Sequence, residues 1–319
     1  MKKSILLSAL SLFLPLTSCS DVNKFHIEIV QLGTHTSLDE INAAITKTLT
    51  DAGYSTGNYE IHQSNAEFQM DTANQIMSII KERAKLVIPI ATPIAQAASQ
   101  FLKEETPIVF AAVSDPVEAG LVENLDAPEG NITGTSDAIQ VDKILSMAKE
   151  IDPELDQLGF IYNPSESNSV SNLAKVEKYC ADNSITLEKR TISAAAEMRE
   201  IAEAISSRVD AIFVSDDNTV ASAMSALSDV TKKNKIPCYV GADSMVKDGG
   251  MMTLGINYTV LGNETGKMTI EVIKGKKISE LPVKVFDQGL NLYINSDYVD
   301  EIGITIPESV TEDQEVIYL

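Results

Sequence analysis

The sequence has no tryptophan, only three histidines, and aromatic residues make up just 5% of it. Without indole rings, a carbohydrate cleft lined by tryptophan is not expected, and any stacking on a flat ligand must come from Tyr or Phe. His26, His35 and His62 show no i,i+4 pair and no cysteine partner at zinc spacing. The spacing therefore predicts no metal site.

Basic residues are scarce as well. Lys and Arg number 25 against 46 Asp and Glu, and the formal net charge is −21. A surface this acidic disfavours nucleic acid and anionic lipid as partners, and it favours solubility.

Cysteine occurs three times, at positions 19, 180 and 238. The chain is 44% hydrophobic, so it can form a core without a disulfide framework. We expect Cys180 and Cys238 to be buried, unreactive thiols; a single bridge between them is the alternative.

Long apolar runs are absent, and only the amino terminus carries a short one. Lys2 and Lys3 precede the apolar stretch 5–16, which leads into Leu16-Thr17-Ser18-Cys19. This order is typical of a bacterial lipoprotein signal peptide, too short to span a membrane, with small residues before the modified cysteine. We expect residues 1–18 to be removed, Cys19 to carry acyl chains such as palmitate, and 19–24 to form the tether. The protein then works outside the cytoplasm, anchored to a membrane. The alternative is an ordinary cleaved signal with an incidental cysteine.

Motifs for bond chemistry are also missing. The segment 134–138 resembles a nucleophile elbow but lacks its closing glycine, and no histidine follows it. The segment 262–268 resembles a phosphate loop, yet it is one residue short and has Met268 where Ser or Thr should bind magnesium. No G-x-G-x-x-G motif occurs. We expect neither an enzyme nor a cofactor.

Short β-rich apolar runs alternate with amphipathic helical stretches along most of the chain. The expected strands are 25–32, 86–90, 107–113, 158–162, 211–214 and 236–240, and the expected helices are 38–51, 72–83, 141–150, 170–180 and 219–233. Repeated strand-then-helix order predicts parallel sheets with right-handed crossovers. Because the pattern restarts after Gly134, two α/β lobes are the better interpretation.

Four turns after these strands pair a capping side chain with a helix start. They are Thr92-Pro93, Asp115-Pro116, Asn168-Ser169 and Asp217-Asn218. In open parallel sheets, strand carboxyl ends and helix amino ends meet at one edge, where ligands bind. Capping alone explains any one of them, but the convergence of four indicates a binding edge.

Several ordered segments carry a family resemblance. They are 91–97, 107–122, 131–137, 162–170, 217–220, 254–258 and 261–268, within a likeness that runs from about Phe25 to about Pro307. This series resembles the ABC-transporter substrate-binding lipoproteins that include tryptophan and tyrosine transport proteins. The resemblance implies a periplasmic-binding-protein type I fold: two doubly wound parallel-sheet lobes joined by three hinge crossings. Lobe 1 would hold 25–135 and 256–285, with a returning helix near 258–275, and lobe 2 would hold 136–255 and 286–319.

On that template an amino acid lies between the lobes, and each of its charges needs a partner. For the carboxylate we expect Asn168 and Ser169, with Thr92 opposite, and for the ammonium Asp243 or Asp137. The further candidates come from the same turns and walls: Ser114, Asp115, Asp217, Asn218, His35 and Tyr258. Alternatives stay open, since Asp243 fits a turn, His35 an exposed loop and Tyr258 a hinge or core position. The family often has His-Pro where this chain has His35-Thr36, which leaves the shape of that wall undetermined.

The function implied is that of a lipid-anchored solute receptor that passes a small ligand, first of all an aromatic amino acid, to an ABC permease driven by its cytoplasmic ATPase. Other amino acids, nucleosides and small peptides stay open as ligands. The alternative role is a ligand-sensing subunit for a membrane receptor.

Overall fold

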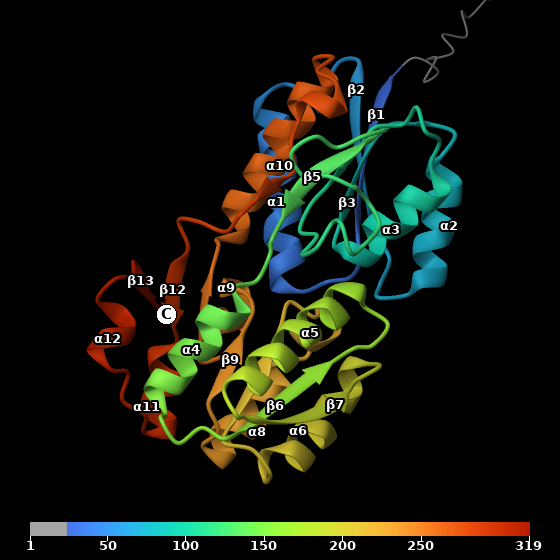
Figure 1. The fold of residues 1–319 in the computed structure, drawn as a ribbon. Coiled ribbons are helices and arrows are strands. Elements are labelled where there is room, and N and C mark those ends of the chain that lie inside the picture. Colours follow the sequence, from blue (N-terminus) through green and yellow to red (C-terminus); the bar gives the residue numbers. More distant parts are fainter. Residues whose placement is uncertain (1–23) are drawn as a thin grey trace, which may run out of the picture.

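The computed structural model describes residues 24–319. The predicted signal peptide, Cys19 and residues 19–23 of the predicted tether lie outside this part of the chain. The described strands form two separate sheets, one in each of two lobes (Figure 1). No helix in residues 24–319 is both long and apolar enough to cross a bilayer.

Lobe 1 is built on a six-stranded sheet in which every pair is parallel. In spatial order its strands are β11 (Lys284–Val285), β5 (Ile132–Ser136), β4 (Ile108–Phe110), β3 (Ala84–Ile90), β1 (Phe25–Gln31) and β2 (Tyr59–Asn65). Helices α1 (Thr36–Asp51) and α10 (Tyr258–Ile273) pack together on one face, and α2 (Met70–Ile80) and α3 (Thr92–Phe101) on the other (Figure 1). A short 3₁₀ turn spans Ile278–Glu280.

Lobe 2 is built on a seven-stranded sheet. In spatial order its strands are β13 (Val316–Tyr318), β12 (Asn291–Ile294), β10 (Met252–Gly255), β9 (Cys238–Val240), β8 (Ala211–Val214), β6 (Gln157–Tyr162) and β7 (Thr186–Thr191). All pairs are parallel except β10 with β12, so the last two strands run against the rest. The helices are α4 (Val141–Ile151), α5 (Ser167–Asp182), α6 (Met198–Ser206), α7 (Asn218–Ala221), α8 (Met224–Asn234), α9 (Asp243–Lys247), α11 (Ser296–Ile302) and α12 (Glu308–Thr311), with a 3₁₀ turn at Ala195–Glu197.

The chain passes between the lobes three times within the described residues. It leaves lobe 1 after β5, returns from β10 into α10, and leaves again between β11 and β12. Two α/β lobes joined by three crossings confirm the predicted fold class. The residues at which each lobe begins and ends stay a prediction.

Helix α10 belongs to lobe 1 because it packs closely on α1. A Cβ added at Gly262 would lie 2.7 Å from the Ile41 carbonyl oxygen, and one at Gly266 would lie 2.7 Å from Thr48 Cβ. Only glycine permits backbones to approach this closely, so these two positions fix the returning helix on the first lobe. Thr48 also donates a hydrogen bond across this contact to Asn263 Oδ1 (3.1 Å).

Both cysteines in the described residues are free and buried, as predicted. Burial raises the pKa of Cys180 to about 11 and that of Cys238 to about 12, which leaves both thiols protonated and unreactive.

Three predicted features are wrong. Thr92 and Asn168-Ser169 do not cap helices: they lie inside the first turns of α3 and α5, and neither helix has a side-chain cap. Asp115-Pro116 does not start a helix: its carboxylate accepts from the Glu118 N–H (3.1 Å), but a single turn ends at Gly120, whose φ is +70°. The helix expected over 219–233 is two helices, α7 and α8, because the chain breaks at Ser222 and Ala223.

Candidate functional site

The two sheets share one topology. Lobe 1 has the order β2-β1-β3-β4-β5 and lobe 2 the order β7-β6-β8-β9-β10. In both sheets the second strand lies on one side of the first and the later strands lie on its other side, so the order of the strands switches at the first strand. Ligands of such folds bind at the carboxyl ends of the strands next to this switch point. The loops after β1, β3, β6 and β8 meet there, at the junction of the lobes.

A cavity lies at this junction, enclosed by loops of the two lobes. Its lining comes from strand-end loops of both lobes: His35, Ser37, Leu38, Ala91, Thr92, Ala112, Ser114 and Tyr258 from lobe 1, and Asp137, Asn168, Asp216, Asn218, Ala221, Ala242 and Met245 from lobe 2 and the crossing that leads into it.

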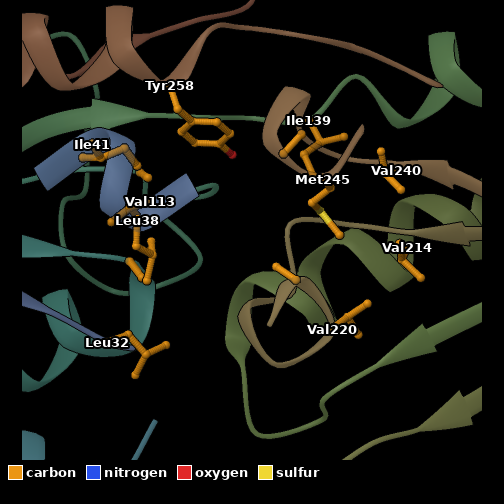
Figure 2. Close-up of a cluster of buried hydrophobic side chains, with 14 of the residues drawn as sticks. Leu32, Leu38, Ile41, Val113, Ile139, Val214, Val220, Val240, Met245 and Tyr258 are labelled. Carbon is orange, nitrogen blue, oxygen red and sulfur yellow. The ribbon is translucent and has the colours of Figure 1, made fainter. Parts of the chain in front are cut away.

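The apolar part of the lining comes from both sides. Figure 2 shows Leu38 on the lobe 1 side and Met245 on the lobe 2 side, with the Tyr258 ring projecting from α10 between them. Leu38 and Met245 are buried, and Tyr258 is 4% exposed. A ligand here meets an aliphatic side chain, a thioether and an aromatic ring, which suits a flat apolar group.

Two buried acids line the cavity: Asp216 in the loop after β8 of lobe 2, and Asp137 on the crossing that directly follows β5. Tyr258 donates a hydrogen bond to Asp137 Oδ2 (2.8 Å), while Asp137 Oδ1 is buried without a partner. Asn172 donates to Asp216 Oδ1 (2.8 Å), and Ser114 donates to Asp216 Oδ2 from across the junction. No Lys or Arg is among the described residues of the lining.

Burial raises the pKa of both acids. Desolvation is the largest cause of the raised pKa of Asp137. At Asp216, desolvation comes first and the nearby Asp137 carboxylate second, and together they raise the pKa of Asp216 to about 7. Two carboxyl groups that face one cavity without a cation are costly to ionise. A positively charged group in the cavity would relieve this cost for both.

The lobe 1 side offers hydrogen-bond donors and the starts of two helices. Helix α3 begins at Thr92, whose hydroxyl is buried and has no partner, and no side chain caps it. Helix α1 begins at Thr36 and likewise has no side-chain cap. The free N–H groups and dipole of a helix start attract an anion, so this wall is complementary to a carboxylate.

Two alanines at this wall have backbone angles that L-residues rarely adopt. Ala91, after β3, has φ 81° and ψ 151°, and Ala112, after β4, has φ 53°. The angles at Ala91 fall in a region that is essentially restricted to glycine and costs about 1–3 kcal/mol. This backbone conformation at Ala91 turns the chain sharply from strand β3 into helix α3, which places the start of α3 at the cavity.

His35 and Asn218 join the two lobes at the cavity. Asn218 donates its amide Nδ2–H to Glu166 Oε2 (2.5 Å), so its Oδ1 is the acceptor for His35 Nε2 (3.2 Å). This bond places the ring proton on Nε2 and leaves Nδ1, which is buried without a partner, as an acceptor. The His35 ring stacks on Phe68. Burial is the largest cause of the lowered pKa of His35, and this lowered pKa keeps the ring neutral at pH 7.

Seven of the eleven residues expected at the site line this cavity: His35, Thr92, Ser114, Asp137, Asn168, Asn218 and Tyr258. In α5, Asn168 donates to the Asp216 carbonyl (3.1 Å) and its buried Oδ1 has no partner.

The other four, Asp115, Ser169, Asp217 and Asp243, are not among the lining residues. Asp217 accepts from the Asn163 N–H (2.6 Å), from Ser169 Oγ (2.7 Å) and, as the cap of α7, from the Val220 N–H. Asp115 accepts from Ser171 Oγ across the junction (3.5 Å).

Asp243 pairs with a cation outside the cavity. Its Oδ2 lies 3.0 Å from Lys247 Nζ, which also donates to Glu40 Oε1 (2.8 Å). Of the two aspartates expected to meet an ammonium group, Asp137 faces the cavity and Asp243 instead supports the contact between α9 and α1.

Two acids were missed by sequence reasoning. Asp216 stands beside Asp217, whose capping pattern accounted for that turn. Glu166 is buried under the site and accepts from the N–H and side-chain groups of Asn218 and Thr219. Desolvation and the nearby Asp217 carboxylate raise the pKa of Glu166 to about 8. Glu166 lies within the family segment 162–170 but was assigned no role there, and Asp216 lies just before the segment 217–220.

Direct contacts hold the lobes together around the cavity. Ser37 and Ser244 hydroxyls lie 2.5 Å apart, Thr36 donates to Asp248 Oδ1 (2.9 Å), and Ser167 donates to Gln96 Oε1 (3.3 Å). With the bonds from His35 and Ser114 these contacts surround the cavity, so the arrangement is a closed one.

The chain is similar to proteins of known structure and function. Residues 26–316 match the model of a family described as ABC transporter substrate binding protein. A tyrosine-binding protein of Clostridioides difficile is 36% identical over 274 residues, which is 85% of this chain and 79% of that protein.

Two solved structures share 33% identity with the chain. The first, an ABC domain from Streptococcus pneumoniae in complex with L-Trp, has a TM-score of 0.86 and covers 92% of this chain and 100% of its own. The second, the ligand-free, open structure of a substrate-binding protein with adhesive properties from Clostridium difficile, has a TM-score of 0.67 and covers 92% of this chain and 99% of its own. The match of 291 consecutive positions to one family agrees with the twin sheets and the cavity between them. The chain therefore belongs to the ABC transporter substrate-binding protein family.

Proposed function

We propose that this protein captures a single aromatic amino acid, tyrosine or tryptophan, between its lobes and delivers it to an ABC permease. The observation that carries the proposal is the division of charge across the cavity. Asp216 of lobe 2 and Asp137 of the crossing after β5 present carboxyl groups, and lobe 1 presents Thr92 and the uncapped starts of α1 and α3. An amino acid carries one group for each wall, an ammonium and a carboxylate, so it satisfies both at once.

The assignment of the charged groups follows from the buried atoms that have no partner. Asp137 Oδ1 and Asn168 Oδ1 are acceptors for the ammonium, and Thr92 Oγ is a donor for the carboxylate. Ser169, which we expected at the carboxylate, donates to Asp217. The oxygens of Asp243 also lack a hydrogen-bond partner, but Asp243 does not line the cavity and is ion-paired with Lys247. We therefore assign the ammonium to Asp137, with Asp216 beside it.

Two observations support an aromatic side chain. The relatives are a tyrosine-binding protein and a complex with L-Trp, and the lining here combines Leu38, Met245 and Tyr258. His35 Nδ1 adds a buried acceptor. Tyrosine and tryptophan both carry a ring donor that can reach such an acceptor, whereas phenylalanine has none.

Closure around the ligand is the proposed mechanism, without bond chemistry. At equal identity of 33%, the chain resembles the L-Trp complex (TM-score 0.86) more than the open, ligand-free structure (0.67). Equal sequence divergence makes lobe arrangement the natural source of this difference. Closure adds the contacts of the second lobe, so it selects ligands that complete both walls.

We place the protein outside the cytoplasm, attached to the membrane through acyl chains on Cys19, where its permease and the ATPase on the cytoplasmic side complete the importer. Labelled palmitate should enter the wild-type protein and not a Cys19→Ser variant. An unlabelled wild-type protein would remove the anchor from the proposal.

The ligand is tested by thermal-shift screening followed by calorimetry on the purified mature chain. We expect L-Tyr or L-Trp to raise Tm, because a ligand at 100 times its Kd adds about 2.7 kcal/mol of stability. Two analogues test the charge assignment: N-acetyl-L-tyrosine lacks the ammonium, and tryptamine lacks the carboxylate. Both should bind far more weakly than the parent amino acid. Equal binding of either analogue, or no binding of any aromatic amino acid, contradicts the proposal.

A further inference from the structure

Two histidines and two glutamates form a compact group at the amino end of the lobe 1 sheet. In the parallel pairing of β1 and β2, His26 is opposite Glu60, and Glu28 is opposite His62. Side chains two residues apart on a strand point to the same face of a sheet, so all four lie on one face. The carboxyl ends of these strands face the ligand cavity, which puts the group at the far end of lobe 1.

Three atoms of this group converge. His26 Nδ1 lies 3.0 Å from His62 Nε2, and Glu60 Oε2 lies 3.9 Å from each of these nitrogens. The nearest point equidistant from the three atoms lies in their plane, about 2.1 Å from each, and a point slightly out of the plane is little farther; these are the lengths of Zn–N(His) and Zn–O(carboxylate) bonds. A Glu28 carboxylate oxygen also lies within 4.8 Å of one ring nitrogen of each histidine.

We propose that His26, His62 and Glu60 bind a divalent transition-metal ion of the Zn²⁺ class. Two imidazoles and one carboxylate are a donor set that zinc uses with a fourth position left to water. The two histidines are 36 residues apart in sequence, so the spacing search that predicted no metal site could not pair them.

The surroundings suit such an ion. Arg83 donates to both oxygens of Glu28 (2.7 and 3.2 Å), which fixes that carboxylate beside the histidines. Glu60 is paired with Lys24 (3.4 Å), and both side chains are more than a third exposed. Exposed ion pairs contribute little to stability, so Glu60 can exchange its ion pair with Lys24 for a bond to the metal ion at a small cost in free energy. The side chains of His26 and His62 are 16% and 30% exposed, which leaves the ion a path from solvent.

A bound ion joins β1 to β2, the edge strand of the lobe 1 sheet. It stabilises lobe 1 without touching the cavity. The inference is therefore independent of the proposed ligand, and its test separates from the amino-acid assay.

The test is Zn²⁺ titration of tag-free, chelator-treated protein carrying Cys19→Ser, read by calorimetry and by the visible spectrum of Co²⁺ in the same site. We expect one ion per chain, tetrahedral Co²⁺ bands and a raised Tm. Each of His26→Gln, His62→Gln and Glu60→Gln should weaken binding at least about tenfold, as loss of a ligand does. The matched control is His35→Gln, which removes the other histidine and should leave metal affinity unchanged.

No saturable Zn²⁺ binding by the wild-type chain, or unchanged affinity in both His26→Gln and His62→Gln, overturns the proposal. Should a variant fail to fold by circular dichroism, imidazole ¹⁵N shifts of the wild-type protein decide instead. Zn²⁺ should then shift the ring signals of His26 and His62 and not that of His35, and any other pattern refutes the site.

Discussion

Replacing Asp137 by asparagine tests how the cavity divides charge. Asparagine has the same shape, and its Oδ1 still accepts the Tyr258 hydrogen bond now made to Asp137 Oδ2 (2.8 Å). The other oxygen, which is buried without a partner, becomes an N–H₂ group. A donor then faces the ligand's ammonium, and the favourable charge is lost.

The expected loss is that of one charge-assisted hydrogen bond, about 1.5–3 kcal/mol. Asp216 stays in the cavity and keeps part of the attraction, so we expect affinity for L-Tyr or L-Trp to fall about 10- to 100-fold, at 1.4 kcal/mol for each factor of ten.

The same substitution should act in the opposite direction on the ligand-free protein. Burial raises the pKa of Asp137 above its ordinary value of 3.8, so this side chain costs folding free energy as pH rises above 3.8. Asparagine carries no such cost. We therefore expect the free energy of unfolding of ligand-free Asp137→Asn to equal or exceed that of the wild type, a trade of stability for binding.

Calorimetry measures the affinity, and denaturant unfolding measures the stability. Asp115→Asn is the matched control, because it removes the same charge at a residue that does not line the cavity. Binding by Asp137→Asn within twofold of the wild type would refute the assignment of the ammonium, and so would an equal loss in the control.

Three further predictions concern stability. Folding raises the pKa of Asp216 from 3.8 to about 7, so the contribution of Asp216 to the free energy of unfolding is fully present below pH 3.8 and is lost as pH rises through about 7. Between pH 5 and pH 8 the free energy of unfolding of ligand-free Asp216→Asn should therefore fall less steeply than that of the wild type, and equal slopes would contradict this. Gly262→Ala should lower the free energy of unfolding by about 1–3 kcal/mol, because the added methyl group pushes α10 away from α1. Gly255→Ala, whose added Cβ meets nothing closer than 3.7 Å, should lower it less in the same denaturant assay, and equal losses would disprove the packing argument. Ala91→Gly should be at least about 1 kcal/mol less destabilising than Ala95→Gly in helix α3, because only the first substitution relieves backbone strain. A lower unfolding midpoint for Ala91→Gly than for Ala95→Gly would show that Ala91 is not strained.

The strands that the sequence predicts are those whose residues form a continuous apolar run. The apolar runs 158–162 and 211–214 correspond to β6 and β8, which lie inside the lobe 2 sheet. The buried strands β5 and β10 were missed because Thr and Gly interrupt that run. Strands β2 and β7 were missed because each lies at an edge of its sheet, where half-buried polar residues replace the apolar run.

The site was predictable in part for a similar reason. Helix-start signals led to Thr92 and Asn168, which line the cavity. They also led to Asp217, which caps α7, while its neighbour Asp216 faces the cavity. A capping signal locates a turn, but it does not tell which of two adjacent side chains turns inward. The approach of His26 to His62 depends on strand register, which spacing in the sequence does not give.

The most direct measurement of the central claim is a crystal structure of the protein with the tightest-binding aromatic amino acid from the screen. The account predicts one ligand in the cavity between the lobes, its ammonium within hydrogen-bond distance of Asp137 and its carboxylate at Thr92 and the start of α3. A ligand bound outside this cavity, or one with its charged groups reversed between the two walls, would contradict it.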